Sequence, residues 1–146
     1  MYDEVKAGNI RHKIAAASRF NAFQEFVFPA TWTDGMLVGG IPEGAVIQLD
    51  PDLDLSQFDL LPGEKAVAIA LQRYGMVLVD WAGGSVIYGE NLNNDKRGRS
   101  WDGILRDWDG GIITIPVKYY RILKLNNVIK MGDAKRKFTE GIPNID

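Results

Sequence analysis

Apolar residues occur mostly in short segments along this chain, and residues typical of turns separate them. Pairs that contain glycine mark many of these turns: Gly8-Asn9, Asp34-Gly35, Gly39-Gly40, Gly83-Gly84 and Gly110-Gly111. Short segments between closely spaced turns favour a sandwich or barrel over a helical bundle or a doubly wound sheet. We therefore predict a mainly β fold, a jelly-roll-like β-sandwich with one α-helix packed on one face or end.

Six segments are predicted strands, at residues 10–17, 25–28, 45–49, 76–79, 85–88 and 119–125. The third follows a turn at Pro42-Glu43-Gly44. The run from Met76 to Val79 is continuously apolar, which predicts a strand buried on both faces. The segment 85–88 comes directly after Gly83-Gly84, so we expect it to pair with the Met76 strand as a hairpin.

One helix is predicted from Pro62 or Gly63 to Tyr74. Proline suits a first helical turn because its missing N–H would have no partner there. An apolar stripe recurs at helical spacing, formed by Val67, Ala70, Leu71 and Tyr74. We expect this stripe to dock onto sheet strands that include the Met76 strand.

A second helical turn is predicted at 101–108, with Ser100 as its N-cap, although Gly103 weakens it. The residues from Asn126 are polar and without clear periodicity. The predicted organisation is therefore a single β-rich domain over residues 1–125 and a polar C-terminal extension over 126–146.

The composition is that of a soluble globular protein and excludes several chemistries. The chain has 146 residues, 46% hydrophobic and 25% charged, with no cysteine. Disulfides, thiolate metal sites and thiol nucleophiles are therefore excluded. A net charge of -2 provides no field that would attract nucleic acid. Local basic groups at residues 96–99 and 135–137 are interpreted as solvated loop or tail.

The hydropathy pattern indicates no membrane partner. No apolar run approaches the roughly 20 residues that a membrane span needs, and the N-terminus lacks the pattern of a signal peptide. The location stays open, although a virion or extracellular location is favoured. The chain either acts where it is made, leaves by another route such as phage release, or is a fragment of a longer secreted chain.

Residues of the types that bind sugars gather between positions 88 and 109. Aromatic rings stack on sugar rings, while carboxylate, amide and guanidinium groups bond to hydroxyls. The predicted ligand-binding residues are Tyr88, Glu90, Asn91, Trp101, Asp102, Arg106, Trp108 and Asp109. The alternative is core packing, since Trp101 and Trp108 are seven residues apart. Trp32, Tyr119 and Tyr120 are also expected to pack in the core or between sheets.

Catalysis by this segment is a second alternative. Glycoside hydrolysis needs two carboxyl groups roughly 5 to 9.5 Å apart. Glu90, Asp102 and Asp109 could supply them if the chain is an enzyme.

Other candidate groups favour structural roles. Asp50, Asp52 and Asp54 alternate, but the glycine and glutamate of an EF-hand loop are absent, so a capped turn is favoured over an irregular calcium site. His12 is the only histidine, which rules out a multi-histidine metal site, and a structural role is favoured. No cofactor is expected.

Several ordered motifs carry a resemblance to a known family. They lie at residues 2–12, 28–35, 47–51, 68–76 and 79–80. Through these motifs, residues 2 to 125 resemble the C-terminal half of a family of large, uncharacterised secreted bacterial proteins. Similar segments occur in phage tail-associated proteins. The resemblance implies a β-sandwich that works on or near polysaccharide surfaces. Family members carry further strands before this region, and the resemblance assigns no catalytic residue.

These observations lead to three functional hypotheses. The first is a non-catalytic carbohydrate-binding or adhesive module of phage or bacterial-surface origin, with polysaccharide as its partner. The second is a polysaccharide-degrading enzyme, a hydrolase or lyase. The third is a purely structural assembly protein that forms homo-oligomers.

Overall fold

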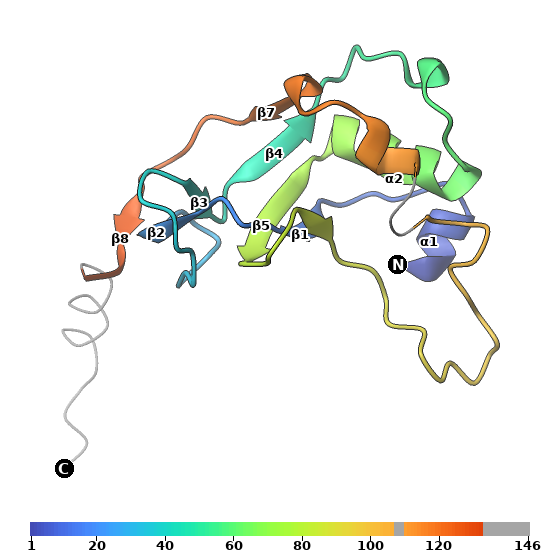
Figure 1. Ribbon diagram of the computed structural model, residues 1–146, viewed down its shortest axis with the longest axis horizontal. Helices are drawn as coiled ribbons and strands as arrows, with labels where there is room; N and C mark the ends of the chain where they lie inside the picture. The colour runs from blue at the N-terminus through green and yellow to red at the C-terminus, as the bar shows by residue number, and fades with distance from the viewer. Residues whose placement is uncertain (107–109, 133–146) are drawn as a thin grey trace. The chain divides into compact units, whose positions relative to one another are not determined.

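The computed structural model describes residues 1–106 and 110–132 (Figure 1). These residues belong to two compact units, each made of three stretches of chain. The first unit contains Met1–Ile14, Ile47–Met76 and Tyr88–Arg121, and the second contains Ala15–Val46, Val77–Ile87 and the residues from Ile122 onward. No helix within the described ranges is long and apolar enough to cross a membrane.

The elements follow one another in a mixed order along the chain. They are α1 (Tyr2–Lys6), β1 (Ile14–Ala17), β2 (Asn21–Phe26), β3 (Ile41–Glu43), β4 (Val46–Leu49), a 3-10 turn (Leu55–Gln57), α2 (Pro62–Arg73), β5 (Met76–Asp80), β6 (Val86–Ile87), 3-10 turns at Gly111–Thr114 and Val117–Tyr119, β7 (Tyr120–Ile122) and β8 (Ile129–Lys130). Among the described residues, a mostly β fold with one main helix is confirmed. The jelly-roll-like sandwich stays a prediction.

The strands form two sheets. The larger has the order β6-β1-β5-β4-β7, and the smaller has the order β3-β2-β8. In the smaller sheet β2 runs parallel to β3 and antiparallel to β8. The segment from Asn126 that we predicted as an extension thus contributes a strand, in which Lys130 faces Glu25 across the ladder.

The predicted helix is confirmed as α2. Pro62 occupies its first turn, and the Glu64 carboxylate accepts the N–H of Leu61 at 2.8 Å, as a group near a helix N-terminus should. Val67, Ala70 and Leu71 are at most 1% exposed. Each of the larger two contributes roughly 1.5–3 kcal/mol by leaving water, so packing of this stripe holds the helix.

Two predictions about the Met76 strand are wrong. Val79 on β5 is 47% exposed, so the strand is not buried on both faces. The segment after Gly83-Gly84 forms β6, but β6 pairs with β1 rather than with β5. The reason is that β1 already lies beside β5: the N–H of Ile14 donates to Gly75, and the N–H of Ser18 donates to Asp80.

Of the second helical turn predicted at 101–108, the described residues form one hydrogen-bonded turn, in which the N–H groups of Ile104 and Leu105 donate to the Trp101 carbonyl at 2.9 and 3.0 Å. The hydroxyl of Ser100 does accept the N–H of Asp102 at 3.1 Å, as a cap would. The chain then makes only a turn, in which Gly103 has a positive φ of 70°. A left-handed residue ends a helical turn instead of extending it, so no helix follows. Trp108 lies outside the described residues.

At Gly44, directly after β3, the backbone lies very close to the backbone of Val27. Replacing this glycine tests whether the close contact matters for stability. Its φ is +85°, and a Cβ there would overlap the carbonyl oxygen of Val27. We expect Gly44→Ala to lower the free energy of unfolding by about 3 kcal/mol, from left-handed strain and the clash together. Urea unfolding followed by tryptophan fluorescence measures this loss.

Gly39 supplies the matched control. It has a similar φ of +73°, but no described atom lies within 4 Å of its added Cβ. Gly39→Ala should therefore lose only the left-handed strain, about 1 kcal/mol. Equal losses in the two variants would show that the approach of Val27 is unimportant.

Candidate functional site

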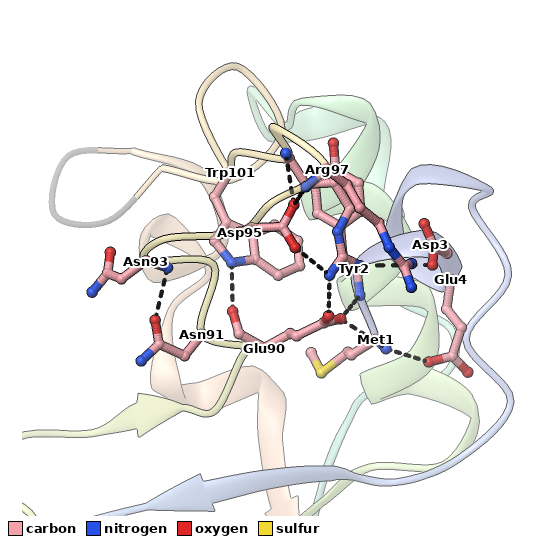
Figure 2. A network of polar contacts seen from close by, with 11 residues as sticks. Met1, Tyr2, Asp3, Glu4, Glu90, Asn91, Asn93, Asp95, Arg97 and Trp101 are labelled. Atoms are coloured by element: carbon pink, nitrogen blue, oxygen red, sulfur yellow. Dashed lines mark hydrogen bonds and ion pairs between the residues drawn. The ribbon is translucent and has the colours of Figure 1, made fainter.

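The loop predicted to bind sugar contains a polar network centred on Glu90, in the first unit (Figure 2). One carboxylate oxygen of Glu90 accepts the backbone N–H of Tyr2 at 3.0 Å, and the other accepts Nη2 of Arg99 at 2.7 Å. The Trp101 indole N–H donates to the Glu90 carbonyl at 2.9 Å. The structure therefore brings Glu90 and Trp101 together, but their polar groups bind the protein itself.

Arg99 completes this network. Its guanidinium also binds Asp95 at 2.9 Å and lies 5.3 Å from the centre of the Tyr2 ring. Hydrogen bonds from Arg99 lower the pKa of Asp95 to about 2. The backbone N–H of Tyr2 and the Arg99 guanidinium lower the pKa of Glu90. A carboxyl group held ionised in this way is poorly suited to act as a general acid.

The remaining residues predicted for this site make separate contacts. Asn91 accepts the N–H of Asn93 at 2.9 Å, and Asp102 accepts the hydroxyl of Ser100 at 2.7 Å. Tyr88 is 40% exposed. Trp108 and Asp109 lie outside the described residues. Contact of this loop with sugar stays a prediction.

Arg106 serves as a clamp on the start of α2. Its Nε and Nη2 donate to the two carboxylate oxygens of Glu64 at 2.9 and 2.6 Å, and Nη1 donates to Asp59 at 2.9 Å. Glu64 is 2% exposed. Burial raises its pKa, but the hydrogen bonds from Arg106 and Leu61 outweigh burial, so the pKa is lowered. The clamp fastens the loop before residue 107 to the helix.

Asp50 and Asp54 accept hydrogen bonds within turns, and His12 pairs with Glu4. Asp50 and Asp54 each accept a backbone N–H two residues on, at 3.0 and 2.9 Å, as capped turns do. Within the described ranges, no group of three or more acidic, histidine or cysteine residues could hold a metal ion. His12 is exposed and lies 3.2 Å from Glu4, and the Lys13 carbonyl and Glu4 raise its pKa.

A different arrangement in the second unit has the features of a ligand site. An open hollow of about 330 Å³, here called the Trp32 hollow, has a lining that includes Pro29, Thr31, Trp32, Glu43, Val77 and Val79. The Trp32 side chain is 55% exposed, so its expected core packing is wrong. An exposed indole beside apolar walls and one carboxyl group matches the general character of small-molecule sites.

Glu43 belongs to a buried polar cluster behind this hollow. It is 3% exposed and accepts the amide Nδ2 of Asn21 at 3.1 Å, while the same amide donates to the Asp80 carbonyl at 2.7 Å. Burial raises the pKa of Glu43, and the neighbouring Asp34 raises it further. Oδ1 of Asn21 is buried and finds no donor among the described residues. The cluster therefore has more acceptors than donors.

A second hollow is lined in part by the residues that directly follow Trp32, from Thr33 to Met36. Its volume is about 420 Å³, and Phe23, Asp34 and Met36 contribute to its lining. Asp34 accepts the backbone N–H of Trp81 at 2.9 Å, which places Asp34 next to a second partly exposed tryptophan.

Sequence reasoning missed Trp32, Asp34 and Glu43 as site residues. A signal was present for Trp32, because it stands in a run of small, polar and turn residues, Pro29-Ala-Thr-Trp-Thr-Asp-Gly35, and not in an apolar strand. Glu43 gave no such signal, since a glutamate between proline and glycine is typical of an exposed turn.

No family model, curated protein or solved structure matches this chain.

The raised pKa of Glu43 predicts a pH dependence of stability. A carboxyl group whose pKa is raised by folding contributes stability below its unfolded pKa, and this is lost as the pH rises through the folded pKa. Starting from the ordinary value of 4.5, we expect the contribution of Glu43 to the free energy of unfolding to fall as the pH rises above about 5. Urea unfolding of the wild type and Glu43→Gln from pH 4 to 8 tests this.

The glutamine variant cannot ionise, so its stability should fall less over this range than that of the wild type. Glu25→Gln, on neighbouring β2, is the matched control and should follow the wild-type profile. Parallel profiles for Glu43→Gln and the wild type would contradict the assignment.

Proposed function

We propose that this chain is a non-catalytic carbohydrate-binding module, of the adhesive or virion-surface kind, and that it binds sugar in the Trp32 hollow. The observation that carries the proposal is an indole more than half exposed in the lining of a hollow whose other described residues are mostly apolar. The resemblance described above implies a domain that works on or near polysaccharide, which is the same class of ligand.

The chemistry of the hollow suits a sugar ring. The apolar face of a pyranose stacks on an indole, and its hydroxyls need acceptors and donors at the edge. Trp32 supplies the aromatic face, and the polar residues of the lining are the exposed Thr31 and the 3% exposed Glu43. The volume of about 330 Å³ lies at the small end of the range for ligand pockets, which suits one or a few sugar residues.

This proposal moves the binding site away from the loop predicted from the sequence. Glu90 and Arg99 in that loop are already paired with each other, and breaking these pairs to bind a ligand would cost free energy. In the Trp32 hollow the indole makes no hydrogen bond with any described residue, so a sugar can stack on it without breaking one. The jelly-roll-like sandwich belongs to the same proposal, because lectin domains commonly use that scaffold.

A glycan array probed with the full chain tests the proposal. We expect retention on at least one class of polysaccharide fragment, reproduced by pull-down on the corresponding insoluble polymer. A blank array together with failure of the pull-down would overturn it.

A specific observation also favours a second candidate, the homo-oligomeric assembly protein. Several large apolar side chains of the second unit are strongly exposed, among them Phe28 at 82%, Met36 at 71% and Val38 at 83%. Exposed apolar side chains mark an interface where they form a continuous patch. Size-exclusion chromatography with light scattering distinguishes the two: a stable oligomer that leaves the array blank would favour assembly over sugar binding.

A further inference from the structure

We infer that the Trp32 hollow accepts sugars that carry no negative charge and rejects uronic-acid polymers. This inference rests on the proposed function and deepens it by naming the class of sugar.

The first observation concerns the charged side chains that line the hollow. Among the described residues that line it, the only ionisable side chain is that of Glu43. The neighbouring hollow likewise has one ionisable lining residue among those described, Asp34. Within the part of the chain that the structure describes, neither lining includes a lysine or an arginine that could pair with a ligand carboxylate. A uronate bound against Trp32 would therefore find no cationic partner in the described lining.

The burial of Glu43, which is 3% exposed, makes added negative charge unfavourable at this place. Burial and the neighbouring Asp34 both raise the pKa of its carboxyl group. A ligand carboxylate in the hollow would face the same two penalties, desolvation and a nearby like charge.

Hydrogen bonding points in the same direction. The polar side chains in the described lining are those of Thr31, which is exposed, and Glu43, which is 3% exposed, and both carry oxygen acceptors. Sugar hydroxyls and ammonium groups donate hydrogen bonds to such acceptors, whereas a carboxylate only accepts them. Neutral and amino sugars therefore complement this site in polarity as well as in charge.

Three oligosaccharides of equal length provide the test: oligomers of N-acetylglucosamine, glucosamine and galacturonic acid, each titrated into the full chain by calorimetry. We expect the first two to bind and the galacturonate oligomer to bind at least about tenfold more weakly at low salt. The difference should shrink when salt is raised, since salt screens like-charge repulsion. It should also shrink in Asp34→Asn, with Glu25→Gln as the matched control.

The outcomes separate this inference from the proposed function. Galacturonate binding that equals or exceeds that of the other two, and that is lost in Trp32→Ala, would overturn the charge selection and leave sugar binding in place. Failure of all three oligomers, together with a blank array, would overturn both. A discrimination against galacturonate unchanged by salt and by Asp34→Asn would also overturn the electrostatic explanation.

Discussion

Replacing Glu64 by alanine is expected to lower the free energy of unfolding by about 3 kcal/mol. The Glu64 carboxylate is 2% exposed and binds Nε and Nη2 of Arg106 as well as the N–H of Leu61. Breaking a buried, hydrogen-bonded ion pair typically costs about 3–5 kcal/mol. We take the lower end because Arg106 is 30% exposed and can be hydrated in the variant.

Chemical denaturation of three variants measures this effect. Lys65→Ala, at the exposed next position of α2, is the matched control and should change stability by less than about 0.5 kcal/mol. Glu64→Gln keeps a cap for the N–H of Leu61 but loses the charge, so its loss should lie between the other two. A loss below about 1 kcal/mol in Glu64→Ala would contradict the role of the clamp.

Replacing Trp32 by alanine is expected to weaken sugar binding about 30-fold. A central tryptophan in a binding surface commonly contributes about 2 kcal/mol or more, which corresponds to that factor. Because Trp32 is 55% exposed, its removal should leave the unfolding transition nearly unchanged. Calorimetric titration with an oligosaccharide identified on the array measures the affinity, and thermal unfolding confirms that the variant is folded.

Trp101→Ala is the matched control for this prediction. Trp101 contacts the Tyr2 ring and bonds to the Glu90 carbonyl, so its loss should destabilise the first unit. Its affinity for sugar at a temperature where it remains folded should equal that of the wild type. The reverse pattern, with affinity lost in Trp101→Ala and kept in Trp32→Ala, would return the site to the loop predicted from the sequence.

The helix could be predicted from the sequence because its signals are local. Pro62, the spacing of Val67, Ala70 and Leu71, and Gly75 lie within fourteen residues of one another and act on the same element. The positions of most strands followed from the turn residues in the same way. Their partners did not, because the pairing of β6 with β1 depends on contacts between residues about 70 positions apart.

The candidate site could not be predicted for a related reason. Side-chain type indicated that tryptophan, asparagine and carboxylates between positions 88 and 109 could bind sugar, but the pairing of Glu90 with Arg99 depends on a loop geometry that the residue pattern does not encode. Glu43 is the opposite case, a site residue that its sequence did not indicate. It stands in a turn-like sequence, but contacts with residues distant in the chain, such as Asn21, leave it buried.

The most direct test of sugar binding in the Trp32 hollow follows the indole N–H resonances of the four tryptophans by NMR while an oligosaccharide from the array is added to the full chain. We predict a saturable shift of the Trp32 resonance, with the Trp101 resonance unmoved. A shift of Trp101 with Trp32 unmoved, or no shift of any indole at saturating ligand, would contradict the proposed site.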